Sequence, residues 1–462
     1  MSSARVTCVV TTYQYGHFIA GCLDSVLAQD HPREQLEVIV VDDGSTDDTR
    51  AIVARYGDAV RYVHQPNAGQ IAATNRGIGE ATGDYITLVD ADDTVTPDCV
   101  SARAAILDAR PEVGLVYGDM DIIDADGALL DPSYHRAYDV PTHVGRVLGP
   151  LLERNFVPGG TMMFRAADRA LYHPIAEHAS VQDWWIAANV AAAAELAYVD
   201  RPMANYRLHG ANDSHGADVE RNARLRANDL KFRRWMLGHL DLAAVALTDV
   251  VRGWFAYQSE LIAMSRALGE PVEQLAPVSA ADAERGRLHL ARGRIARDRG
   301  DIERAIRILV RAVSADPLSA APRDELHELI QGRLPAGEPL DVRGFVTLTA
   351  AEELLADAGL LRAYASVFDG HDDATLLIYA SQADPSIGTR LAQLVSSAGL
   401  DGPDSPDMVA VFGPRDPCAH ATVPRAVHAT LSERSGHVPG VRRWGSQAIG
   451  GLREYAQTCL RP

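Results

Sequence analysis

Three carboxylates crowd the end of one short apolar run, because Asp90, Asp92 and Asp93 fall within four residues. The run before them, residues 85–89, is too short for a helix and follows Gly83, so it predicts a buried strand. Neighbouring like charges oppose one another's ionisation unless a cation compensates them. Hard oxygen ligands at a strand end suit Mg²⁺ or Mn²⁺, which also binds substrate phosphates. A solvated acidic loop is the competing interpretation.

The elements before this strand predict how the acids are positioned. Alternating elements are expected, with strands at 6–12, 36–41 and 60–64 and helices over 19–29, from Asp48 onward and over 70–80. That alternation predicts a doubly wound α/β sheet with right-handed crossovers. Ligands of such sheets bind beyond the carboxyl ends of the strands, where Asp42-Asp43 and the later acids fall. A nucleotide can lie between them, with its base near Asp43 and its diphosphate near Asp92.

Composition excludes several classes of partner. The chain has 462 residues, of which 47% are hydrophobic, and its length predicts about two to four domains. A formal net charge of -18 argues against nucleic acid as a partner and against docking on anionic membranes by charge. The five cysteines are scattered, which predicts neither a disulfide framework nor a zinc site. No signal-peptide pattern and no apolar stretch of membrane-spanning length is visible, so we expect a cytoplasmic protein without a transmembrane segment.

Five short motifs follow one another along the chain. They are Val41-Asp42-Asp43-Gly44-Ser45-Thr46-Asp47, Asn67-Ala68-Gly69 through Asn75-Arg76-Gly77, Gly83-Asp84-Tyr85 through Asp90-Ala91-Asp92-Asp93, Gln182-Asp183-Trp184-Trp185, and Tyr206-Arg207-Leu208-His209-Gly210. Each is weak alone, but together and at this spacing they are specific. In these motifs the chain resembles the family-two inverting glycosyltransferases with the GT-A fold, over roughly residues 4–215.

The resemblance implies a Rossmann-like, mostly parallel α/β domain that binds a nucleotide-sugar donor and Mn²⁺ or Mg²⁺. It also implies a role for individual residues. The donor nucleotide would contact Thr11, Tyr13, Asp42, Asp43, Asn67 and Asp90, the metal would contact Asp90, Asp92 and His209, and Asp183 would be the catalytic base.

Most of these residues also have a structural alternative. Asp183 can cap a helix, and Asp42 and Asp43 can be turn residues. His209 can be an ordinary loop histidine, and Asn67 can serve a turn.

The sequence departs from the family pattern at three points, which bear on the expected site residues and activity. Gln182 stands where the family usually has Glu. The segment Ala73-Thr74-Asn75 lacks an expected Arg, for which Arg76 is a shifted substitute. The Gln-x-x-Arg-Trp motif of processive members is absent, so repeated polymer extrusion is not expected.

The chain beyond these motifs changes character. We expect a glycosyltransferase domain over 1–216, a helical segment over 217–331 with one tetratricopeptide-like hairpin, a linker at 332–339, and a small α/β domain of unknown role over 340–462. The C-terminal unit is expected to serve acceptor binding or oligomerisation. The helical hairpin is expected to bind an extended peptide or to mediate dimerisation, and a structural spacer is the alternative.

The sequence therefore predicts a metal-dependent, inverting, non-processive glycosyltransferase that uses a nucleotide-diphosphate sugar, most simply a UDP-sugar. The acceptor would be a glycan, a lipid-linked saccharide or a peptide. A non-catalytic scaffold that binds nucleotide sugar or peptide is an alternative. A sugar-phosphate nucleotidyltransferase would need a glycine-rich phosphate loop after the first strand, which Tyr13-Gln14-Tyr15-Gly16-His17 does not provide.

Overall fold

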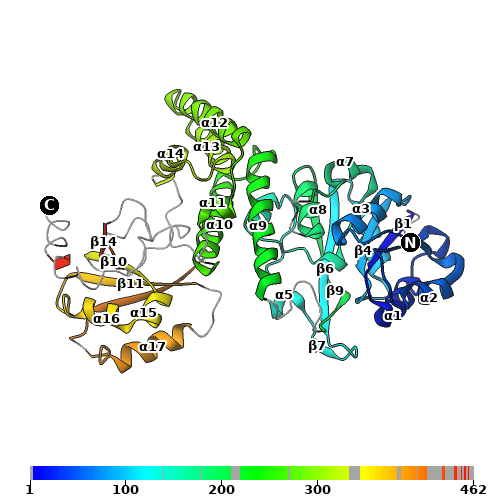
Figure 1. The fold of residues 1–462 in the computed structure, drawn as a ribbon, viewed down its shortest axis with the longest axis horizontal. Helices are drawn as coiled ribbons and strands as arrows, with labels where there is room; N and C mark the ends of the chain where they lie inside the picture. Colours follow the sequence, from blue (N-terminus) through cyan, green and yellow to red (C-terminus); the bar gives the residue numbers. More distant parts are fainter. Residues whose placement is uncertain are drawn as a thin grey trace. The chain divides into compact units, whose positions relative to one another are not determined.

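A computed structural model gives the fold (Figure 1). It describes residues 4–138, 140–177, 179, 181–209, 219–268, 271–331, 344–381, 387–402, 404–413, 429–431, 442–444, 449, 452–453 and 456. The chain forms two compact units, Met1–Gly253 and Trp254–Pro462. The predicted boundary at 216/217 and the predicted linker at 332–339 lie outside the described residues. None of the described helices combines the length and the apolar character that crossing a bilayer demands.

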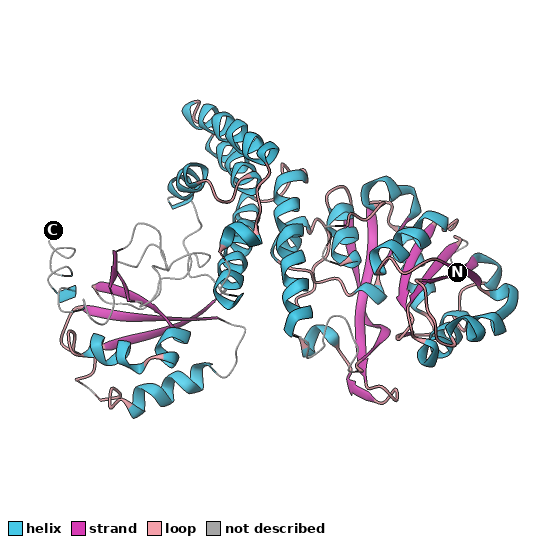
Figure 2. Ribbon diagram, viewed as in Figure 1, coloured by secondary structure: helices cyan, strands magenta, loops and turns pink. Residues whose placement is uncertain are grey.

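The first unit is built on one mostly parallel sheet (Figure 2). Across this sheet the strands are β3 (Arg61–His64), β2 (Leu36–Asp42), β1 (Val6–Thr12), β4 (Tyr85–Asp90), β8 (Met163–Arg165), β6 (Val113–Ile123), β9 (Glu195–Arg207) and β5 (Thr94–Val95), with β7 (Leu129–Asp131) beside β6. Strands β1 to β4 pair in parallel, as their alternation with helices predicts, whereas β8 runs antiparallel to β4 and β6. The predicted fold class is confirmed for this unit.

Helices cover both faces of the sheet. In bounds, they are α1 (Gly16–Leu27), η1 (Arg33–Gln35), α2 (Thr49–Val53), η2 (Ala54–Ala59), α3 (Gln70–Glu80), α4 (Cys99–Ala109), α5 (Tyr134–Ala137), α6 (Leu148–Glu153), η3 (Gly159–Thr161), η4 (Ala166–Asp168), α7 (Arg169–Tyr172), α8 (Gln182–Ala191) and α9 (Val219–His239). Successive strand residues face opposite sides. Cys8 and Val10 of β1 therefore pack in one core with Ile19 of α1, while Val9 faces α3.

One glycine sets how closely α3 approaches the sheet. A Cβ added to Gly77 would lie 2.2 Å from Cγ1 of Val9, far inside van der Waals contact. The close approach matters because the first turn of α3 carries Gln70 to the carboxyl edge of the sheet.

The second unit combines helices with a small parallel sheet. Helix α10 (Leu247–Leu268) begins within the first unit and is followed by α11 (Val272–Leu275), α12 (Ala280–Asp298), α13 (Ile302–Ala315) and α14 (Ala320–Gln331). The hairpin of α12 and α13 turns at Gly300, whose φ is +79°, and Gly293 leaves room for Leu309.

The described strands of the second sheet run in the order β12 (Asp407–Gly413), β11 (Ala374–Ser381), β10 (Phe345–Ala350), β13 (Ala429–Leu431) and β14 (Arg442–Trp444), all parallel. Helices α15 (Ala351–Ala356), α16 (Ala358–Ala365) and α17 (Ile387–Ser397) pack against them. The predicted small α/β module is confirmed in fold class.

Candidate active site

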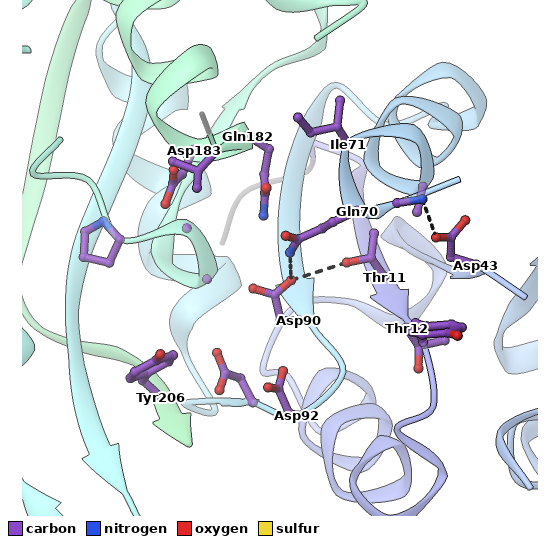
Figure 3. Close-up of a pocket in the computed structure, with 18 of the residues that line it drawn as sticks. Thr11, Thr12, Asp43, Gln70, Ile71, Asp90, Asp92, Gln182, Asp183 and Tyr206 are labelled. Atoms are coloured by element: carbon purple, nitrogen blue, oxygen red, sulfur yellow. Dashed lines mark hydrogen bonds between the residues drawn. The ribbon is translucent and has the colours of Figure 1, made fainter. Parts of the chain in front are cut away.

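One cavity of about 1090 Å³ lies at the carboxyl edge of the first unit's sheet, and Figure 3 shows part of its lining. We use two names for parts of this lining. The acid wall consists of Thr11, Asp43, Asn67, Gln70, Asp90 and Asp92, and the aromatic wall consists of Tyr134, Asn155, Phe156, Gln182, Asp183, Tyr206 and Asn228.

The structure brings most of the predicted site residues to this cavity. Thr11, Tyr13, Asn67 and the acids Asp43, Asp90, Asp92 and Asp183 all line it. They are far apart in sequence, but parallel strands β1, β2 and β4 end at one edge, and α8 starts beside it.

Asp90 ends β4 and is held from two sides. Its Oδ1 accepts hydrogen bonds from Thr11 Oγ1 at 3.3 Å and from Gln70 Nε2 at 3.0 Å (Figure 3). These contacts join the ends of two neighbouring strands through the first residue of α3. Both donors are neutral side chains, so the position of the Asp90 carboxylate at the cavity is fixed by these two hydrogen bonds without an ion pair to either residue.

Asp92 and Asp93 are both buried where the chain leaves β4. The pKa of Asp93 is raised well above its usual value by burial and by the charges of Asp92 and Asp90. Asp93 accepts a hydrogen bond from the backbone N–H of Arg207 at 2.8 Å, and the Arg207 side chain donates to the carbonyl oxygen of Asp92. The acids therefore repel one another, as their crowding in the sequence predicts.

His209 lies beside this cluster, although it does not line the cavity itself. Its Nε2 is 3.0 Å from Oδ2 of Asp92. Its ring packs against Phe18, with ring centroids 4.9 Å apart, and stands edge-on to Tyr15. Both ring contacts come from α1 and its N-cap, and they hold the His209 ring against Asp92.

Adjacent residues Asp42 and Asp43 point to different places. Asp43 Oδ1 accepts from Ala68 N and Gln65 Nε2, and its Oδ2 accepts from Gly69 N at 2.7 Å. Asp43 therefore holds the loop that contains Asn67. A carboxylate has about four acceptor sites, so one site of Asp43 is not used by these three hydrogen bonds.

Asp42 is fully buried and lies away from the cavity lining. Its carboxylate accepts from Ser45 N and from the hydroxyl of Tyr62. The structure thus corrects the expectation that Asp42 contacts a nucleotide: it shapes the turn after β2.

Asp183 lies in the first turn of α8, whose N-cap is Val181, so it is not the helix cap. Its Oδ1 accepts a hydrogen bond from the adjacent backbone N–H of Trp184 at 2.6 Å. Burial raises the pKa of Asp183 to about 7, and the charges of Asp90 and Asp229 act in the same direction. A carboxyl group with such a pKa exchanges protons near neutral pH, which suits a general base.

Close packing leaves Asp183 facing backbone on one side. A Cβ added to Gly159 would lie 3.3 Å from Oδ2 of Asp183. Trp184 and Trp185 are both buried, with indole N–H groups bonded to the carbonyls of Leu151 and Tyr172. The tryptophans therefore anchor α8 and leave Asp183 at the cavity.

The suggested substitute for the missing family Arg is not at the site. Arg76 is exposed and pairs with Glu80 one turn along α3. The neighbouring Asn75 does line the cavity, and its side chain amide makes two hydrogen bonds with the backbone of Ile175, at 2.7 and 2.9 Å. Asn75 thereby ties α3 to the segment that leads into α8.

Sequence reasoning missed several lining residues. Those with polar or aromatic side chains are Gln70, Tyr134, Asn155, Phe156, Glu177 and Asn228. Most of them lie outside the motifs, so no spacing rule points to them. Gln70 is the exception, because it lies inside the motif that runs from Asn67 to Gly77 and opens a predicted helix.

The acids fit a hard divalent cation in chemistry but not as a complete cage. Among the described residues, no three His, Cys, Asp or Glu side chains gather closely enough to hold a metal by themselves. Asp92, together with either Asp90 or His209, can supply part of a shell, and Mg²⁺ and Mn²⁺ commonly complete theirs with water and substrate phosphates. The crowded carboxylates therefore fit a cation that arrives with a phosphate-bearing ligand.

A mostly parallel sheet that gathers acids from neighbouring strand ends around one cavity defines an α/β domain of the nucleotide-binding class. Comparison with known families then narrows the class. Residues 7–172 match the model of "Glycosyl transferase family 2". The match covers 166 of the chain's 462 residues, and within it the predicted resemblance to this family is confirmed.

Relatives of the chain agree with this family. The chain is 27% identical over 226 residues to an uncharacterised glycosyltransferase of Nostoc sp., covering 46% of this chain and 67% of the relative. It is 30% identical over 225 residues to an uncharacterised protein of Mycobacterium tuberculosis, covering 46% of this chain and 61% of that protein. It is 35% identical over 99 residues to glycosyltransferase GlyA of Streptococcus pneumoniae, covering 21% of this chain and 14% of the relative. The chain thus spans less than two thirds of most curated relatives it matches.

Solved structures give a more distant likeness. TarS of S. aureus in complex with UDP-GlcNAc matches 73% of this chain and 95% of its own, with 18% identity and a TM-score of 0.44. A mannosyltransferase of Pyrobaculum calidifontis in complex with GDP-Man and Mn²⁺ matches 68% of this chain and 87% of its own, with 19% identity and a TM-score of 0.41.

Proposed function

We propose that this protein is a metal-dependent, inverting, non-processive glycosyltransferase that moves a sugar from a nucleotide-diphosphate sugar, most simply a UDP-sugar, to an acceptor hydroxyl. The observation that carries the proposal is the convergence of Asp43, Asp92 and Asp183 on one cavity. If these three acids had faced separate cavities, the proposal would have had no support.

The proposed reaction assigns each wall a task. The acid wall binds the donor, with the nucleotide toward Asp43 and the diphosphate toward Asp92. Asp183 accepts the proton of the acceptor hydroxyl as that oxygen bonds to the anomeric carbon from the face opposite the leaving group. The bond from the anomeric carbon to the diphosphate oxygen breaks, and the nucleoside diphosphate leaves with the electron pair.

The metal belongs to the acid wall in this proposal. Asp92, with either Asp90 or His209, would hold Mg²⁺ or Mn²⁺. When bound, such an ion supplies Lewis-acid stabilisation of negative charge on the diphosphate. The protein itself contributes the placement of these ligands, since Thr11 and Gln70 fix Asp90 and a packed ring fixes His209.

Donor turnover by a matched pair of variants tests the proposal. The purified chain is incubated with UDP-glucose, UDP-GlcNAc or GDP-mannose and Mn²⁺, and release of nucleoside diphosphate is measured. Asp92→Ala should lower this rate by about 100-fold or more, a typical loss when one electrostatic contact to the developing charge is removed. Asp126→Ala removes an exposed acid in the β6–β7 turn and should leave the rate unchanged. Full turnover by Asp92→Ala would refute the assignment.

A further inference from the structure

The cavity has room for more than a donor. Its volume of about 1090 Å³ lies just above the roughly 300–1,000 Å³ that pockets for single drug-sized ligands occupy. The proposed function places the donor on the acid wall, so the space before the aromatic wall is available to a second molecule. That molecule must present its nucleophile to Asp183.

Aromatic rings dominate the space beside Asp183. Tyr206 lines the cavity and is drawn on the same side of the view as Asp183 (Figure 3). The next residue, Arg207, bonds to Asp92 and Asp93. Tyr134 stands edge-on to Tyr206, with ring centroids 6.1 Å apart, and its pKa is raised by burial and by the nearby charge of Asp183. Phe156 also lines the cavity, as do Tyr13 and Tyr15. The face of an aromatic ring carries negative charge density and attracts the weakly positive C–H groups of a flat ligand.

Neutral amides line the same cavity as these rings. They are Asn155, Gln182 and Asn228, and each amide offers both donors and acceptors of hydrogen bonds. They come from three separate elements, since Asn155 precedes η3, Gln182 opens α8 and Asn228 lies on α9. Rings with amides at several angles around them suit a compact ligand with hydroxyl groups on its rim and C–H groups on its face.

The charge of the cavity has one sign. Its described lining contains six carboxyl groups and no Lys, Arg or His; the acids are Asp43, Asp90, Asp92, Asp93, Glu177 and Asp183. A divalent cation can offset the acid wall, but that cation would already face the donor diphosphate. Of the described cations, Arg154 lies near enough to Tyr134 to act on its pKa, but it does not line the cavity. A phosphate or carboxylate on the second ligand would therefore meet repulsion mainly from the lining acids, and its charge would also oppose ionisation of Asp183.

We propose that the acceptor is an uncharged sugar ring, bound with one face on Tyr206, with its edge toward Tyr134 and with its hydroxyl groups toward Asn155, Gln182 and Asn228. The proposal rests on the proposed function and names its acceptor class. It disfavours acceptors whose reacting unit carries a phosphate. It also disfavours a peptide, because extended peptides commonly bind by pairing with a strand edge, whereas this wall presents side chains.

A comparison of acceptors tests the proposal directly. The full chain, with Mn²⁺ and whichever of UDP-glucose, UDP-GlcNAc and GDP-mannose it hydrolyses, is offered three sets of probes. These are neutral mono- and disaccharide glycosides of p-nitrophenol, the same sugars carrying a 6-phosphate, and Ser-, Thr- and Asn-containing peptides. Transfer to the neutral glycosides is expected to exceed transfer to their phosphorylated counterparts by about tenfold or more, because like charges repel strongly in a confined site.

Tyrosine variants then test where the acceptor binds. Tyr206→Ala should raise the KM for the neutral acceptor about tenfold, within the range typical of losing one ring stacked on a ligand, with a smaller effect on kcat. Tyr206→Phe keeps the ring and should return that KM to near the wild-type value. Tyr138→Ala is the structural control, because Tyr138 packs on Tyr134 at 4.8 Å but does not line the cavity, and it should leave the acceptor KM near wild type.

Each outcome decides the matter. Preferred transfer to phosphorylated sugars or to peptides, or no transfer to any neutral glycoside by protein that hydrolyses its donor, overturns the acceptor proposal and leaves the proposed function standing. Equal KM effects of Tyr206→Ala and Tyr138→Ala also overturn it. A chain that neither binds nor hydrolyses any of the nucleotide sugars refutes the proposed function, and the acceptor proposal falls with it.

Discussion

The two walls of the cavity are built on opposite principles. On the acid wall, carboxylates accept hydrogen bonds from the protein's own chain: Asp43 holds the backbone of Ala68 and Gly69, and Asp90 is held by Thr11 and Gln70. On the aromatic wall, Asp183 receives a hydrogen bond from the next backbone N–H and has no ion pair among the described residues. Its pKa rises to about 7.

This difference separates binding from proton transfer. Groups that are already hydrogen-bonded are pre-organised, so they can position a donor without moving. A group kept short of compensating charge gains basicity instead, because burial disfavours its ionised form. The acid wall thus suits a donor site, and Asp183 suits a base.

The largest effect that this comparison predicts is that of Asp183→Asn. The amide has almost the same shape but cannot accept the proton, so kcat should fall by about 10²- to 10⁴-fold, the range that general bases contribute. The donor KM should stay near wild type, because the acid wall is untouched. Steady-state kinetics with saturating acceptor measure both values. A kcat above a third of the wild-type value would make Asp183 a structural residue.

The next effect separates the neighbours Asp43 and Asp42. Asp43→Ala frees the loop at residues 65–69 from its three hydrogen bonds with this carboxylate, so the donor KM should rise about 10- to 100-fold, as expected for losing bonds to a charged group. Asp42→Ala leaves Tyr62 and the turn without their acceptor and should lower the melting temperature.

Donor titration by calorimetry and thermal melting distinguish the pair. If Asp42→Ala weakens donor binding as much as Asp43→Ala does, once both proteins are shown to be folded, the acid wall is not organised by Asp43.

The pH dependence tests the aromatic wall by itself. Because the pKa of Asp183 is raised, its carboxyl stays protonated to higher pH, and the base is lost as the pH falls through about 7. With one essential base, kcat/KM should therefore drop about tenfold for each pH unit below that value. The donor Kd at the same pH values serves as the control. A kcat/KM that is flat from about pH 6 to pH 8 would contradict the link between burial and basicity.

The sequence reveals the acid wall far better than the aromatic wall, for a physical reason. Strand ends followed by Asp-Asp-Gly or Asp-x-Asp are local patterns, and parallel strands bring such ends to one edge, so the amino-acid pattern alone predicts that Asp43, Asp90 and Asp92 lie together. It does not tell Asp42 from Asp43, because neighbouring residues at a strand end point to opposite sides.

The aromatic wall has no comparable local signature. Tyr134 lies on a one-turn helix, Asn155 in a loop and Asn228 on a helix beyond the family match, so only the packing of these elements brings them together. Gln182, Asp183 and Tyr206 are exceptions, because all three fall in motifs. The raised pKa of Asp183 depends on burial and on charges from two distant elements, which no single stretch of sequence specifies.

The smallest predicted effect concerns the residue that joins the two walls. Asn75 lines the cavity from α3 and holds the backbone of Ile175 through two hydrogen bonds, so Asn75→Ala should loosen the segment that leads into α8. Two neutral hydrogen bonds contribute about 1–3 kcal/mol together, part of which water replaces, so we expect a roughly threefold loss in kcat. Gln70→Ala is the matched control, because Gln70 lies on the same helix and the same cavity but contacts Asp90 of the acid wall. It should raise the donor KM by a similar factor and leave kcat nearly unchanged. If both variants change the donor KM alone, α3 serves the acid wall only, and the aromatic wall is positioned without it.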